Sequence, residues 1–146
     1  MDMIFAVVPV CIGSLIYLLF RTKDTWIIYA IGGAGGGPLL DFARTLVRPL
    51  NPYVSGFALY SLPSALWAFS FMFCIVKIWA DTLVSIAAIA VIALTAAVVL
   101  GSEVGQALDL VQGRFDVADV AANAVGLSAG GLTAYATQRN KLRSIC

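Results

Sequence analysis

Long apolar runs separated by short polar stretches dominate the hydropathy pattern of the chain. At about 1.5 Å per residue, four of these runs can cross a hydrocarbon core of about 30 Å as helices: residues 3–20, 62–79, 83–101 and 117–137. Pro63 falls in the first turn of the second run, which suits a helix start. The pattern predicts an all-α, polytopic transmembrane helical bundle, folded as one membrane domain over residues 1–146.

A fifth apolar segment, residues 26–40, is uncharged but short, and it contains five glycines before Pro38. Such a run is a poor helix former. It is either a fifth span packed against protein or a re-entrant or interfacial segment. The positive-inside rule favours five spans, because that arrangement places six of the nine basic residues on one side, whereas four spans divide them five and four. Residues 41–60 are predicted to form a membrane-surface helix followed by an irregular loop.

Composition supports a membrane protein. Hydrophobic residues make up 61% of the 146 residues and charged residues 12%, against roughly half and about a quarter in soluble domains. A globular protein of this size cannot bury so many hydrophobic residues. We therefore expect the lipid bilayer to surround much of its surface. The net charge of +1 gives no electrostatic footprint for nucleic acid. The chain lacks histidine, the commonest general base and transition-metal ligand, and we expect no cofactor and no metal site.

Polar residues gather where the third run ends and the fourth begins. Because the connection between these two runs is short, the helices should be antiparallel neighbours whose polar faces meet at the turn. Charged residues beside a membrane core are costly and tend to mark functional sites. We therefore predict a ligand-binding or functional polar cluster made of Glu103, Gln106, Arg114, Asp119 and Asn123.

A purely structural explanation is open for the same region. Asp116 is placed to cap the last helix, with Asp119 in its first turn to complement the helix dipole. Gly126 and Gly130 form a small-xxx-small pattern that lets helices approach closely. Arg114 could pair with an acidic neighbour, and the two amides could hydrogen-bond between helices. A hairpin held together by these contacts needs no ligand.

The spacing Glu-x2-Gln followed by Arg-x4-Asp-x3-Asn-x2-Gly, within residues 97–132, resembles the VanZ-like family of small bacterial membrane proteins. Seven positions match: Glu103, Gln106, Arg114, Asp119, Asn123, Gly126 and Gly130. Residues 60–67 also look like a stretch found in some small members. The resemblance implies four or five spans in the inner (plasma) membrane of a bacterial cell envelope, with the polar cluster near one membrane face. The founding member confers low-level resistance to the glycopeptide teicoplanin, but the resemblance supplies no reaction.

Three functions fit this reading. The favoured one is a non-catalytic binding or accessory protein, in which Arg114 engages the anionic group of a lipid-linked or amphiphilic ligand. The second is an enzyme acting on a lipid-linked substrate, with Glu103 and Asp119 as acid and base or as oxygen ligands of Mg²⁺; no nucleophile or phosphate-loop motif accompanies them. The third is a structural subunit packed against other membrane proteins. A transporter is disfavoured, because the spans are few and no internal repeat is visible.

Overall fold

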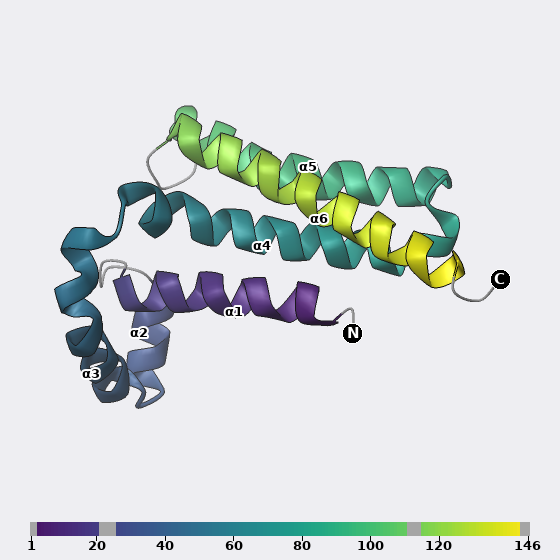
Figure 1. The fold of residues 1–146 in the computed structure, drawn as a ribbon. Helices are drawn as coiled ribbons and strands as arrows, with labels where there is room; N and C mark the ends of the chain where they lie inside the picture. Colours follow the sequence, from purple (N-terminus) through teal and green to yellow (C-terminus); the bar gives the residue numbers. More distant parts are fainter. Residues whose placement is uncertain (1–2, 21–25, 111–114, 144–146) are drawn as a thin grey trace.

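The computed structural model describes residues 3–20, 26–110 and 115–143, and within these ranges every regular element is a helix (Figure 1). This confirms the predicted all-α fold class. The long helices are α1 (Met3–Phe20), α4 (Gly56–Ile78), α5 (Ile86–Ala107) and α6 (Val117–Arg143). The short elements are the α-helices α2 (Trp26–Gly33) and α3 (Gly37–Val47) and the 3₁₀ helices η1 (Arg48–Tyr53) and η2 (Ala80–Thr82).

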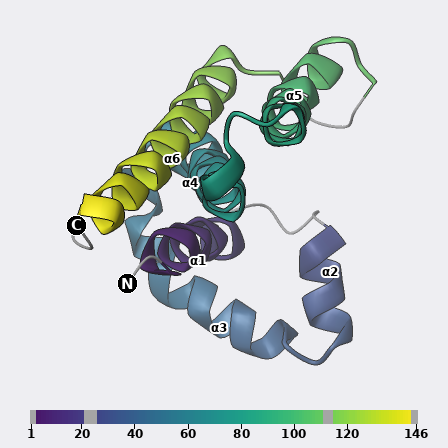
Figure 2. The same cartoon turned by 90° about the vertical axis from the view of Figure 1, so that its right-hand side faces the viewer.

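Helix α4 is the centre of the bundle. Helices α1 and α6 pack against it from different sides, α5 lies alongside the α4–α6 pair, and α2 and α3 sit at one end near α1 (Figures 1 and 2). Helices α4 and α6 share the most extensive contact, whereas α5 touches both of them more sparingly. The main cluster of buried hydrophobic residues follows this division, because its members come from α4 and α6: Ala68, Met72, Phe73, Val76, Leu127 and Ala134.

Two glycines of α6 set its close approach to α4. A Cβ atom built on Gly126 would overlap the carbonyl oxygen of Ala65, and one built on Gly130 would overlap that of Phe69. Between helices in lipid the hydrophobic effect supplies little attraction, so van der Waals contact at small residues carries the association. At the far end of the pair, the Lys77 Nζ lies 3.4 Å from the hydroxyl of Thr137 and 3.4 Å from the Gln138 side-chain oxygen.

Helix α1 packs on the opposite side of α4 through a glycine and aromatic rings. Gly13 is buried, and a Cβ there would lie 2.9 Å from the Trp67 Nε1 and 3.0 Å from the carbonyl oxygen of Pro63. The rings of Tyr17 and Trp67 are 5.5 Å apart at their centroids. Together with the rings of Phe5 and Phe73, whose centroids are 5.7 Å apart, these contacts hold α1 alongside α4 over most of its length.

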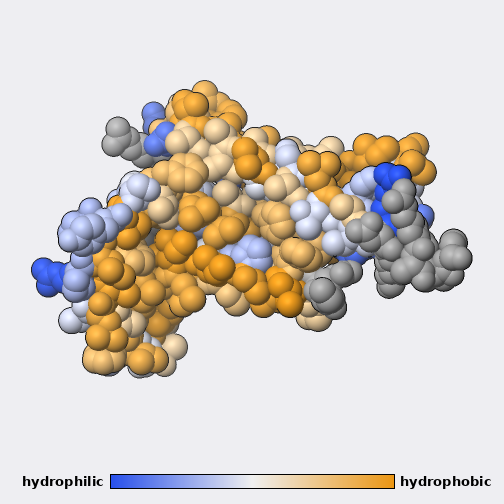
Figure 3. All heavy atoms as spheres, viewed as in Figure 1, coloured by the Kyte–Doolittle hydropathy of each residue, from blue (hydrophilic) through white to orange (hydrophobic). Residues whose placement is uncertain are grey.

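Within the described residues, three helices are long and apolar enough to cross a membrane: α1, α4 and α5. Helix α6 has 27 residues but is not among them, and Asp119 and Asn123 lower the hydropathy of its first turns. The fourth predicted span is therefore not confirmed. Hydrophobic residues cover much of the face seen in Figure 3, and the most hydrophilic ones lie mainly toward the two ends of the bundle. This distribution suits a lipid surrounding.

The predicted beginning of the second span, at residue 62, is wrong. Helix α4 begins at Gly56, where the Ser55 hydroxyl accepts a hydrogen bond from the Ala58 amide at 3.2 Å. Pro63 is buried inside the helix and does not mark its start. Ser85 caps α5 in the same way, and α5 continues beyond the predicted end at residue 101.

The glycine-rich segment 26–40 is not a single helix, so its interpretation as a fifth continuous span is wrong. Helix α2 ends at Gly33, and Gly35 adopts a φ of 83°, a left-handed conformation that glycine takes without steric cost. Helix α3 follows at once, with Pro38 in its first turn. It then leads into η1, so an ordered 3₁₀ helix occupies much of the predicted irregular loop. An interfacial or re-entrant position for these two short helices stays a prediction.

Candidate functional site

Two of the predicted polar residues meet inside the bundle. The Asn123 Nδ2 on α6 donates a hydrogen bond to the Glu103 Oε1 on α5, at a distance of 3.3 Å. Glu103 is 7% exposed and Asn123 is 3% exposed, so both side chains are almost fully shielded. They lie where the C-terminal turns of α5 approach the first turns of α6, at the upper left of the bundle in Figure 1.

Three oxygen atoms around this contact are buried and have no hydrogen-bond partner within the described part of the chain. They are the Glu103 Oε2, the Asn123 Oδ1 and the Asp119 Oδ1. Asp119 lies one helical turn before Asn123, and its carboxylate repels that of Glu103, as does the carboxylate of Asp116. Leaving one buried polar atom unpaired costs about 1–3 kcal/mol. Among the described residues, the site is therefore rich in acceptors and short of positive charge.

The N-terminus of α6 explains one of the acidic residues without a ligand. The Asp116 Oδ1 accepts a hydrogen bond from the Ala118 amide at 2.9 Å, as an N-cap does. Asp116 is exposed, so this structural role accounts for it fully. Arg114, the predicted cation of the cluster, lies outside the described residues.

The capping motif at the C-terminus of α5 keeps Glu103 in regular helix. The Leu110 amide donates to the Gly105 carbonyl at 2.8 Å and the Asp109 amide to the Gln106 carbonyl at 3.2 Å, a pair of bonds that forms a Schellman motif. Asp109 takes the left-handed position of this motif with a φ of 55°. Gln106 is half-buried one turn beyond Glu103 and supplies a backbone acceptor to the cap. Because the helix continues to this cap, Glu103 is held within regular helix.

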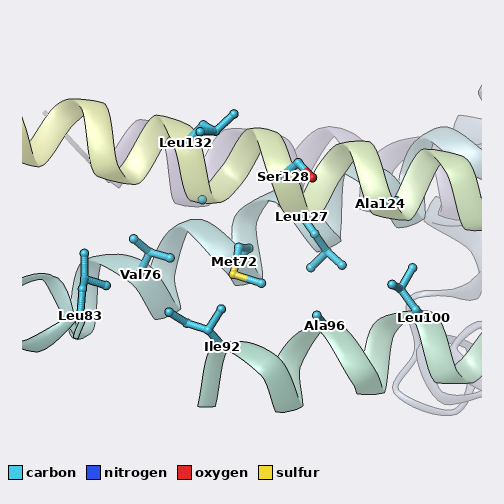
Figure 4. A pocket seen from close by; sticks show the side chains of 11 residues that line it. Met72, Val76, Leu83, Ile92, Ala96, Leu100, Ala124, Leu127, Ser128 and Leu132 are labelled. Atoms are coloured by element: carbon cyan, nitrogen blue, oxygen red, sulfur yellow. The ribbon is translucent and has the colours of Figure 1, made fainter. Parts of the chain in front are cut away.

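A groove between α5 and the α4–α6 pair adjoins this region, and sequence reasoning missed it. Its volume is about 750 Å³, and its lining is almost wholly apolar, with Ser128 contributing a hydroxyl (Figure 4). Met72 and Leu127 project into it from one side, and Ile92 and Leu100 from the other. The signal in the sequence is a set of small residues that leave space unfilled where larger ones would close it: Ala96, Ala124 and Gly131.

No group of three or more histidine, cysteine, aspartate or glutamate side chains is placed to hold a metal ion within the described ranges. The two cysteines there, Cys11 and Cys74, are free and belong to different helices. Glu103, Asp119 and Asn123 thus offer oxygen atoms from two carboxylates and one amide, while the Asn123 Nδ2 donates to Glu103.

A sequence model of the Ferroportin1 (FPN1) family matches residues 50–137. The match is more than half of the chain and takes in all of α4 and α5 and most of α6. It therefore includes both the polar cluster and the groove. No curated protein and no solved structure matches the chain.

This match overturns the VanZ-like resemblance, and with it the functions inferred from that resemblance. A glycopeptide-resistance or accessory binding protein, an enzyme acting on a lipid-linked substrate and a structural subunit are all unsupported. The physical reason lies in the motif itself. A helix cap, two small residues at a helix crossing and an amide between helices serve any tightly packed membrane hairpin. Their spacing is therefore a weak marker of one family.

Proposed function

The chain belongs to the Ferroportin1 (FPN1) family, and we propose that it serves the transport of a metal cation across a membrane, with divalent iron as the expected substrate. The family match over residues 50–137 is the observation that carries this proposal. The matched part of the bundle contains a carboxylate and an amide buried between otherwise apolar helices, and such groups within membrane helices tend to mark ion pathways. We place the chain in a cell membrane as a multi-pass protein.

A rigid pair and a loosely held helix give this function a physical basis. Transport by alternating access needs one element to move against a fixed one around the binding site. Helices α4 and α6 contact each other closely through Gly126 and Gly130, whereas the groove separates α5 from them. We propose that α5, which carries Glu103, moves against the α4–α6 pair and exposes the cluster to the water phase.

Transport is testable with the full chain reconstituted into liposomes that contain a metal-quenched fluorophore. With iron(II) added outside under anaerobic conditions, the fluorescence should fall faster than in protein-free liposomes. Equal rates in the two preparations would refute the proposed function.

Two substitutions on α5 distinguish a block of helix movement from a general effect of adding a ring to this helix. Ala96→Phe places a ring in the groove and should slow iron entry by holding α5 in one position. Val98→Phe adds the same ring on the outer face of the same helix, where Val98 is 64% exposed, and should transport as the wild type does. Equal slowing by both variants would argue against movement of α5 along the groove.

A further inference from the structure

We propose that the side-chain oxygens of Glu103, Asp119 and Asn123 form a binding site for one hard divalent cation, between the last turns of α5 and the first turns of α6. This inference deepens the proposed function, and it rests on that function in taking the bound ion to be the transported one. Ion binding itself can be measured without any transport.

The burial of unpartnered acceptors is the evidence that a ligand is needed. Glu103 and Asn123 are each more than nine-tenths buried, and each has one oxygen without a donor within the described residues. The Asp119 Oδ1 is buried and unpaired beside them. Charged groups withdrawn from water are stable when they are paired or coordinate a metal. Within the described part of the chain, the two carboxylate oxygens satisfy neither condition, and the uncharged Asn123 Oδ1 has no donor.

Hydrogen bonds that hold the hairpin together account for only part of the cluster. The Asn123 amide uses one donor on the Glu103 Oε1, and Asp116 caps α6. Neither contact supplies a donor to the remaining oxygens of Glu103, Asp119 or Asn123. A buried water could donate two hydrogen bonds to them. It would leave the repulsion between the two carboxylates in place, whereas a divalent cation removes it.

The chemistry of the donors selects the class of ion. Carboxylate and amide oxygens are the ligands of hard cations such as Mg²⁺, Mn²⁺ and Ca²⁺, and neither imidazole nor thiolate is part of the set. When both are ionised, the carboxylates of Glu103 and Asp119 supply two negative charges, which matches one divalent ion. Three protein oxygens leave positions for water in a coordination shell of six or more. The geometry therefore points to modest affinity and ready release, as a transport site requires.

The site is tested by titrating Mn²⁺ into the full chain in nanodiscs and following the loss of the electron paramagnetic resonance signal of free Mn²⁺. Wild type should bind Mn²⁺ saturably, with competition by Mg²⁺. Glu103→Gln keeps the shape and removes one charge, and it should weaken binding by at least about tenfold. Asp109→Asn removes the same charge from an exposed residue just beyond the end of α5, at a position where asparagine tolerates the left-handed backbone, and should bind as the wild type does.

Circular dichroism and gel filtration of each variant separate loss of the site from loss of the fold. Should Glu103→Gln unfold, Asn123→Asp provides the second test, because an added carboxylate in the same place should tighten Mn²⁺ binding. No saturable binding by wild type, or equal affinity in folded Glu103→Gln and Asp109→Asn, would overturn the site. Iron transport at the wild-type rate by a Glu103→Gln protein that no longer binds Mn²⁺ would show that the bound ion is not the transported one. Binding without transport by wild type would instead refute the proposed function and leave the site standing.

Discussion

Replacing Gly130 with alanine tests whether the contact between α6 and α4 holds the bundle together. The new Cβ would overlap the carbonyl oxygen of Phe69 and lie 2.9 Å from its carbonyl carbon. Both atoms belong to the backbone of α4, so no change of side-chain rotamer can make room. The two helices must move apart, which loosens every other contact along their shared face.

The matched control for this substitution is the neighbouring residue. A Cβ on Gly131 would lie 3.5 Å from the Met72 Cγ, an ordinary van der Waals contact. Both substitutions gain the same helix propensity, about 1 kcal/mol for glycine to alanine. Overpacking costs about 1–3 kcal/mol and applies to Gly130→Ala alone. We therefore expect Gly130→Ala to be less stable than Gly131→Ala by about 1–3 kcal/mol, because the propensity gain cancels between them.

The free energy of unfolding can be measured by titrating SDS into mixed micelles and following the helical circular dichroism signal. The comparison between two variants of the same helix removes most effects of the micelle. Equal midpoints for Gly130→Ala and Gly131→Ala, with equal transition slopes, would refute the claim that the α4–α6 crossing is limited by backbone contact.

Three further substitutions test other contacts of the fold. Gly13→Ala places a Cβ 2.9 Å from the Trp67 Nε1 and should lower stability by up to about 2 kcal/mol, because overpacking costs about 1–3 kcal/mol and helix propensity returns about 1 kcal/mol; the same SDS titration with tryptophan fluorescence measures it, and a higher midpoint would contradict the α1–α4 packing. Asp109→Gly relieves a residue with a φ of 55° and should stabilise the chain by about 0.5–1 kcal/mol, seen as a higher midpoint of thermal unfolding; a lower midpoint would show that the aspartate side chain is needed there. Ser85→Ala removes the hydroxyl that accepts from the Ala88 amide at 3.2 Å and should cost about 1 kcal/mol; hydrogen exchange at that amide should become faster, and unchanged protection would argue against the cap.

A helix start was predicted correctly where the capping residue was recognised in the sequence. Helix ends that were judged from the apolar run alone were predicted wrongly. Residue 117 was predicted as the start of the last helix, and α6 begins there because Asp116 caps it. The start of α4 was placed six residues too late because Pro63 was taken as a helix start, although Ser55 supplies the cap. Helix α5 runs past its predicted end at residue 101, because a side chain such as that of Glu103 can be buried against another helix.

The candidate site was predictable in its position along the chain but not in its surroundings. A short connection between two antiparallel helices was enough to place Glu103 near Asn123, and their side chains are hydrogen-bonded. The unpaired oxygens depend on side-chain packing, which a spacing pattern does not contain. The groove was invisible for a related reason. All but one of its lining residues come from three helices, and the sequence does not say which faces of those helices meet.

The helix against which Gly126 and Gly130 pack determines how the candidate site is built. Gly126 and Gly130 could have packed against α5, the neighbour of α6 in sequence, which would have closed the groove and fixed Glu103 rigidly. They pack against α4 instead, and Lys77 joins the same two helices near their other end. Helix α5 is consequently held to α6 by the Glu103–Asn123 hydrogen bond at one end and by sparse contacts elsewhere. An ion that binds these side chains would therefore act on the least restrained of the four long helices, which couples occupancy of the site to the position of α5.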